Sequence, residues 1–203
     1  NQLHDLSLKK INIIAVSKTF PMSDIDPLIK FGQIHFGENK VQEAIDKWTD
    51  IKIKNENLKL HMIGKLQTNK VKYVIPLFDY IHSLDNFKLA EKIAVEQQKK
   101  KKELKIFIQV NIGNEPQKNG LLVNDLQEFY DKCTKELKLN IEGLMCIPPQ
   151  TQDVGKYFKQ MNNLNKTINL KELSMGMSED YLDAVNYGAT YIRIGSKIFG
   201  NRV

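Results

Sequence analysis

The 203-residue chain is poor in cysteine, and it lacks any long apolar run. Its two cysteines, Cys133 and Cys146, are too few for a disulfide scaffold or a cysteine-based zinc site, and they fit a reducing compartment. No segment approaches the roughly 20 apolar residues of a membrane-spanning helix, and the start of the sequence has no secretory pattern. These absences predict a cytoplasmic protein with no membrane partner.

Arginine is nearly absent as well, because only Arg193 and Arg202 stand among the 30 basic residues. The net charge of +6 is compatible with nucleic-acid binding. However, the lysines are spread along the whole chain, and the aromatic content of 8% indicates no platform on which bases could stack. The dense lysine run at 99–102 is typical of a solvated helix end. We therefore expect no nucleic-acid partner.

Several sequence patterns of known chemistry are missing. The chain has no glycine-rich dinucleotide turn after its first apolar run, no P-loop and no Gly-x-Ser-x-Gly elbow. His35, His61 and His82 do not have the spacing of metal ligands, and we interpret each as a hydrogen-bonded core histidine.

Eight short apolar runs recur along the chain, most of them rich in β-branched or aromatic residues and too short for helices. They predict buried strands at 11–16, 33–36, 60–63, 80–83, 105–110, 141–147, 173–175 and 191–194. Apolar residues at helical spacing lie between many of these runs. They predict helices over 41–48, 87–94, 122–137 and 154–168, one after Thr68, and one with Ser178 as its N-cap.

Strands that alternate with helices indicate a parallel sheet, because each parallel crossover needs a helix-sized connection. The sheet could close into a (β/α)₈ barrel or stay open and doubly wound. The count of eight and the missing dinucleotide turn favour the barrel, as a single domain over residues 1–203. Only about ten residues precede the first strand, so we expect a covering N-terminal helix to be missing or truncated.

In such a barrel, function lies at the carboxyl ends of the strands. Lys18 follows the first strand directly, where desolvation would favour its neutral amine. A neutral amine is a nucleophile toward carbonyls and can form a Schiff base. The alternative is that Lys18 is one more solvated lysine. Asn39, after the second strand, would either line the barrel mouth or cap the next helix.

The last two strands provide a candidate anion site. Arg193 lies in an isoleucine-rich strand, where a buried guanidinium needs either a core carboxylate or a ligand as partner. Gly195 and Ser196 then open a short segment whose backbone N–H groups would bind an anion, and Ser174 ends the strand before. An amine on the first strand facing a phosphate cradle suits pyridoxal 5'-phosphate (PLP), which carries an aldehyde and a phosphate. The pattern allows this ligand without requiring it.

Seven segments, in order, are similar to those of one known family. They are 15–19 (AVSKT), 35–39 (HFGEN), 61–70 (HMIGKLQTNK), 81–85 (IHSLD), 143–145 (GLM), 173–178 (LSMGMS) and 193–200 (RIGSKIFG). With them the chain resembles the pyridoxal phosphate homeostasis protein family from about residue 11 to residue 200. The resemblance departs at the N-terminus, where the family usually carries a further helix.

The resemblance implies a barrel like the N-terminal domain of alanine racemase, with PLP held as an aldimine on Lys18. It places the phosphate against Ser174 and the turn at Gly195 and Ser196. It also brings Arg193 to the pyridine nitrogen, where a guanidinium that keeps its proton would weaken the ring as an electron sink. Asn39 would line the pocket near the ring.

The resemblance further implies PLP binding and delivery without catalytic turnover, by a monomer that could serve PLP-dependent apoenzymes. Racemisation needs a second acid or base, which a C-terminal β-domain supplies in alanine racemase, and this sequence ends at Val203, soon after its last strand. Two alternatives remain: a PLP-dependent amino-acid racemase that uses Lys18 as its base, and a Schiff-base aldolase without cofactor. A nucleic-acid binder is more remote.

Overall fold

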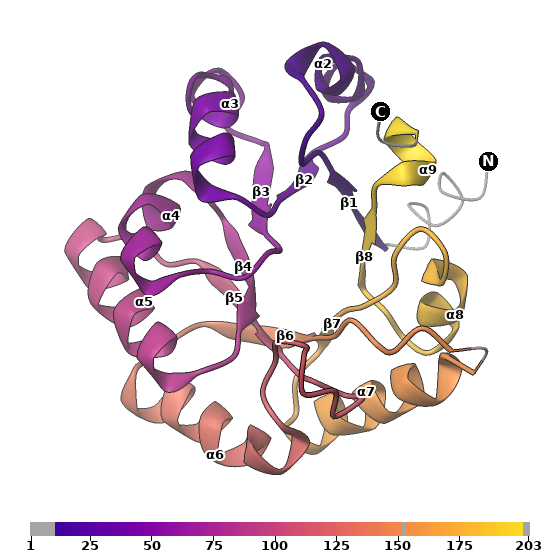
Figure 1. Ribbon diagram of the computed structural model, residues 1–203. Helices are drawn as coiled ribbons and strands as arrows, with labels where there is room; N and C mark the ends of the chain where they lie inside the picture. The colour runs from indigo at the N-terminus through magenta and orange to yellow at the C-terminus, as the bar shows by residue number, and fades with distance from the viewer. Residues whose placement is uncertain (1–10, 152, 201–203) are drawn as a thin grey trace.

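Eight parallel strands form a closed barrel in the computed structural model, which describes residues 11–151 and 153–200. Each strand pairs with the next, and β8 pairs with β1 to close the ring, as Figure 1 shows. The strands are β1 (Asn12–Val16), β2 (His35–Glu38), β3 (Lys59–Met62), β4 (Tyr80–Leu84), β5 (Lys105–Gln109), β6 (Ile141–Met145), β7 (Glu172–Ser174) and β8 (Tyr191–Ile194). The predicted barrel and its eight strands are confirmed, and the open sheet is wrong.

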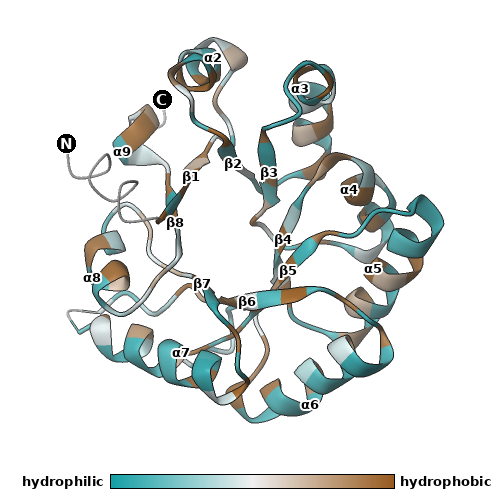
Figure 2. Ribbon diagram, turned by 180° about the vertical axis from the view of Figure 1, so that it is seen from behind, coloured by the Kyte–Doolittle hydropathy of each residue, from teal (hydrophilic) through white to brown (hydrophobic). Residues whose placement is uncertain are grey.

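Helices surround this ring and connect its strands (Figure 1). They are α2 (Met22–Phe31), α3 (Val41–Lys54), α4 (Val71–Leu77), α5 (Phe87–Lys100), α6 (Leu126–Asp131), α7 (Gly155–Thr167), α8 (Tyr181–Asn186) and α9 (Ser196–Phe199), with 3₁₀ turns η1 (Thr68–Lys70) and η2 (Val123–Asp125) and the π-helical η3 (Lys132–Glu136). Hydrophilic residues lie along the outer sides of α6 and α7 in Figure 2. No helix in the described part of the chain is both long and apolar enough to cross a membrane.

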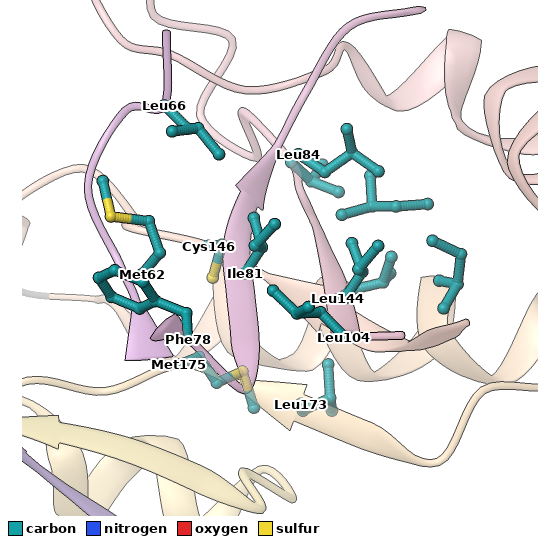
Figure 3. Close-up of a cluster of buried hydrophobic side chains, with 14 of the residues drawn as sticks. Met62, Leu66, Phe78, Ile81, Leu84, Leu104, Leu144, Cys146, Leu173 and Met175 are labelled. Atoms are coloured by element: carbon teal, nitrogen blue, oxygen red, sulfur yellow. The ribbon is translucent and has the colours of Figure 1, made fainter. Parts of the chain in front are cut away.

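Alternate strand residues point to opposite sides of the barrel wall. One set packs against the helices in a large apolar core, part of which Figure 3 shows: Met62 of β3, Ile81 of β4, Leu144 of β6 and Leu173 of β7. The other set points into the barrel. Its apolar members are Ile14, Tyr80, Phe107, Met145 and Tyr191. The interior is thus partly aromatic, and polar side chains complete it.

The structure differs from the predicted helices in three places. The single helix predicted over 122–137 is a 3₁₀ turn, a short α-helix and a π-helical turn, and Leu122 precedes them in extended backbone with 48% of its surface exposed. Ser178 is not an N-cap, because a turn separates it from α8, and Asp180 Oδ1 accepts from the Met177 N–H instead. The helix α2, which carries Pro27 in its interior, has no counterpart in the predictions.

Two predictions concern residues beyond the described ranges. The missing or truncated N-terminal helix falls on residues 1–10, which lie outside the described residues. The single domain over 1–203 includes those residues and 201–203 as well, so it stays a prediction.

Candidate functional site

The carboxyl ends of the parallel strands share one mouth of the barrel, and there the structure gathers most of the predicted residues. Lys18 lies half-buried in the turn after β1, and Asn39 follows β2, the neighbour of β1 on one side. Gly195 and Ser196 follow β8, the neighbour on the other side. The rings of Phe20 and Phe199 stack with centroids 4.7 Å apart, which joins the Lys18 turn to α9.

A buried ion pair supports the turn that carries Lys18. Lys47 Nζ on α3 lies 3.0 Å from Oε1 of the fully buried Glu38, and it also donates to the backbone oxygen of Ser17 at 2.9 Å. The same Glu38 oxygen accepts from Ser17 Oγ at 2.8 Å and from Trp48 Nε1 at 3.0 Å. We call Ser17, Glu38, Lys47 and Trp48 the β1 clamp. It fixes the residue directly before Lys18.

The residue directly after Lys18 is fixed as well. The backbone N–H of Thr19, at a positive φ of 70°, donates to Glu43 Oε1 at 2.6 Å. Burial by itself would raise the pKa of Glu43, but this hydrogen bond and the ammonium of Lys47, 3.1 Å away, lower it overall. Lys18 thus sits between two anchored neighbours. No sequence pattern indicated either anchor, because both depend on side chains that α3 brings to the turn.

Arg193 is a buried cation that is held by neutral acceptors. Only 4% of the residue is exposed. Its Nη1 donates to Ser174 Oγ at 2.7 Å, and its Nη2 donates to the backbone oxygen of Cys146 at 2.9 Å. Within 11–151 and 153–200, no carboxylate lies at ion-pair distance from Arg193. Burial lowers the pKa of Arg193, and the charge of Asp180, from further away, opposes that shift. The predicted alternative of a core ion pair is therefore not seen in this part of the chain.

Ser174 is completely buried beneath the guanidinium. Its Oγ lies 2.7 Å from Arg193 Nη1 and 2.9 Å from His82 Nδ1. Its predicted contact with a phosphate stays a prediction. Ser178, the second hydroxyl near the end of β7, lies beside the Gly195 turn: its Oγ accepts from the backbone N–H of Gly195 at 3.3 Å.

The three histidines form one hydrogen-bonded chain inside the barrel. His35 Nδ1 lies 2.9 Å from His61 Nε2, and His61 Nδ1 lies 2.8 Å from His82 Nε2. Their interpretation as hydrogen-bonded core histidines is confirmed. In the described residues, no three or more His, Cys, Asp or Glu side chains are grouped so that they could hold a metal ion. Each ring also packs on aromatic neighbours, for example His82 on Phe107 with centroids 4.3 Å apart.

Burial keeps these histidines neutral. It lowers the pKa of His35 to about 4, with help from the positive charge of Lys59. The pKa of His61 and of His82 is well below the usual value because both are fully buried, and the cation of Arg193 lowers that of His82 further.

The residues at the mouth fit an anionic ligand with an aldehyde. A buried cation without an ion-pair partner favours a negative group nearby. Asn39 Oδ1 is buried and accepts no hydrogen bond from any described residue. A ligand that donates a hydrogen bond to this oxygen would satisfy it. The Gly195 turn opens α9, with the hydroxyl of Ser178 beside it.

Comparison with known proteins agrees with this fold. The family model described as "Alanine racemase, N-terminal domain" matches residues 3–203. The pyridoxal phosphate homeostasis protein of Pasteurella multocida is 37% identical over 202 residues, which cover 95% of this chain and 87% of that protein. The Escherichia coli (strain K12) protein of the same name is 34% identical, over 97% of this chain and 88% of its own.

A solved structure is similar over almost its whole length. PipY of Synechococcus elongatus, in a structure with PLP bound, is 34% identical and superimposes with a TM-score of 0.89, over 98% of each chain. With the fold, the motif order and these relatives in agreement, the chain belongs to the pyridoxal phosphate homeostasis protein family, built on the barrel of the alanine racemase N-terminal domain.

Proposed function

We propose that this chain binds PLP at the barrel mouth and serves PLP homeostasis in the cytoplasm. The observation that carries the proposal is Arg193, a buried cation that faces only neutral acceptors in the described residues. Such a cation next to a half-buried lysine turn suits a ligand that combines an anion, a ring nitrogen and an aldehyde. The PLP-bound structure of PipY supports the same ligand.

Each residue at the mouth has a distinct part in this proposal. Lys18 Nζ would bond to the aldehyde carbon as a Schiff base, with release of water. The backbone N–H groups at Gly195 and Ser196, with the Ser178 hydroxyl, would hold the phosphate. Arg193 would face the ring nitrogen. The Asn39 side chain would lie beside the ring.

The role we propose is binding and delivery, without turnover, to PLP-dependent apoenzymes. The names of the relatives describe homeostasis and no reaction. A guanidinium at the ring nitrogen would keep the ring a weak electron sink, since Arg does not give up its proton. We propose that the chain acts as a monomer. The two free, buried cysteines suit the reducing cytoplasm.

Absorbance spectroscopy tests the covalent bond to Lys18. Purified protein mixed with PLP should develop a visible band that borohydride removes while it fixes the cofactor to the chain. Lys18→Ala should lose the band, whereas Lys65→Ala, an exposed lysine in the loop after β3, should keep it. A band that survives in Lys18→Ala would place the Schiff base on another lysine.

Chiral analysis of amino acids tests the absence of turnover. The PLP-loaded protein incubated with L-alanine should form no D-alanine above the level of free PLP. Production of D-alanine that disappears in Lys18→Ala would instead support the racemase alternative.

A further inference from the structure

The histidine chain crosses the barrel interior and ends at the guanidinium of Arg193. It starts at His35, the first residue of β2, and passes through His61 of β3 and His82 of β4. It then reaches Ser174 at the end of β7, which accepts from Arg193. Four consecutive hydrogen bonds of 2.7–2.9 Å therefore connect the amino-terminal end of the barrel with the candidate site.

Counting donors fixes the direction of every hydrogen bond in this chain. Arginine can only donate, so Ser174 Oγ is the acceptor in their contact. The Ser174 hydroxyl is completely buried, and within the described residues His82 Nδ1 is its one acceptor. A proton on His82 Nδ1 would leave that hydroxyl without an acceptor, which is costly for a buried donor. The hydroxyl therefore donates to His82 Nδ1.

The same assignment of donors and acceptors extends to the three histidines. Because His82 Nδ1 accepts, its proton is on Nε2, and Nε2 donates to His61 Nδ1. His61 consequently carries its proton on Nε2 and donates to His35 Nδ1. His35 in turn carries its proton on Nε2. All three rings are neutral and share one tautomer, with each hydrogen pointing away from Arg193.

Aligned in this way, the chain places the negative end of each bond dipole toward the guanidinium. Hydrogen bonds in series polarise one another, which makes Ser174 Oγ a stronger acceptor than an isolated hydroxyl. A carboxylate at this position would hold Arg193 too, but it would cancel the charge. The neutral chain stabilises the cation and leaves its positive charge uncompensated.

We propose that His82, His61 and His35 are positioning residues, which act through Ser174 to hold Arg193 in place with its full charge available to a ligand. The identity of that ligand rests on the function proposed above, whereas the effect on Arg193 does not. The experiments below separate the two, because the first two need no ligand.

The first experiment reads the Arg193 guanidinium in the ligand-free protein. The chain has only two arginines, so protein labelled with ¹⁵N-arginine gives a simple NMR spectrum that Arg202→Lys assigns. Arg193 should show two separate, slowly exchanging Nη signals, because Nη1 and Nη2 are both held. Ser174→Ala and His82→Phe should speed this exchange at least about tenfold, since a charge-assisted hydrogen bond is lost or weakened.

The matched control is Ser83→Ala. Ser83 is a buried serine on β4, beside His82 in sequence, and its hydroxyl has no partner in the described residues. Ser83→Ala should leave the exchange of the Arg193 Nη signals unchanged. Equal exchange rates in Ser174→Ala, His82→Phe and Ser83→Ala would overturn the proposal.

The second experiment reads the tautomers in wild-type protein labelled with ¹⁵N-histidine. His35, His61 and His82 should each be protonated on Nε2, and a proton on His82 Nδ1 would overturn the proposal. This measurement decides the matter even if His82→Phe fails to fold.

The third experiment adds PLP. Ser174→Ala and His82→Phe should raise its dissociation constant about tenfold and shift the visible band, which a general loss of stability would not do. Ser83→Ala should match wild type. An unchanged constant and band in both variants would overturn the positioning role. Wild-type protein that does not bind PLP would refute the proposed function, while the two NMR results would still decide the effect on Arg193.

Discussion

At the scale of single residues, the β1 clamp shows how a buried charge can position a neighbour. Glu38 is fully buried, and its Oε1 accepts from three donors, while Oε2 has no partner in the described residues. Lys47, with 10% of its side chain exposed, supplies the compensating charge. Breaking such a pair from one side leaves an unpaired buried charge.

Lys47→Met should therefore lower the free energy of unfolding by about 3–5 kcal/mol, as measured by urea denaturation. It should also weaken PLP binding, because the backbone oxygen of Ser17 loses its donor next to Lys18. Lys54→Met, at an exposed position of the same helix, should change stability by less than about 0.5 kcal/mol. Similar stability of the two variants would show that the pair does not stabilise the fold.

At the scale of elements, the contact between β6 and β7 places Ser174 under Arg193. Gly143 of β6 lies opposite Glu172 of β7, and a Cβ at Gly143 would overlap the carbonyl oxygen of Glu172. β7 has only three residues, and β6 is the element that it contacts most. The glycine is needed for this close approach.

Gly143→Ala should lower the free energy of unfolding by roughly 3 kcal/mol or more, because backbone would have to move. Gly32→Ala is the matched control. Gly32 has a φ of +100° but open space around it, so only backbone strain of about 1–2 kcal/mol is expected. Chemical denaturation of both variants measures the difference, and an equal loss would argue against the overlap.

Much of the fold at this scale was predictable from the sequence, and the reasons are local. Runs such as 11–16 and 105–110 carry apolar residues on both faces of a strand, so these strands were predicted. The helix α2 was missed because it contains Pro27 and buries only Ile25 completely. The ends of β2 shifted because Gly37 and Glu38 resemble a loop, although both lie in the strand.

The candidate site was predictable only in part. Lys18, Asn39, Gly195 and Ser196 lie one or two residues after the ends of strands, and parallel strands bring their carboxyl ends together. Their roles toward a ligand stay predictions. The histidine chain depends on the stagger of β2, β3, β4 and β7, which no local pattern contains. The position of Ser178 beside Gly195 depends likewise on the contact between the loop after β7 and the turn after β8.

At the scale of the whole molecule, the three neutral histidines couple stability to pH. In the unfolded chain each takes up a proton near pH 6.5. In the folded barrel the pKa of His35 is about 4, and burial keeps the pKa of His61 and of His82 well below 6.5. Below pH 6.5 the unfolded state therefore binds more protons than the folded state.

The free energy of unfolding should thus be highest above pH 6.5 and fall as the pH drops from 6.5 toward 4, by up to about 1.4 kcal/mol per pH unit for each histidine. Urea denaturation between pH 7.5 and pH 5 measures this slope before carboxylates contribute. His35→Gln should make the free energy of unfolding depend less steeply on pH, because one fewer proton is taken up on unfolding. A flat profile over that range would mean that the buried rings are protonated in the folded protein.

The single tryptophan of the chain is part of the β1 clamp, because Trp48 Nε1 donates to Glu38 within the network that fixes Ser17. This indole, shielded from water, is a natural optical probe for the Lys18 turn. Excitation of Trp48 should yield emission that dims as PLP binds, since a bound chromophore nearby accepts the excitation energy. Titration with the vitamer would then follow occupancy without any added dye, and emission that stays constant while the visible band grows would contradict this expectation.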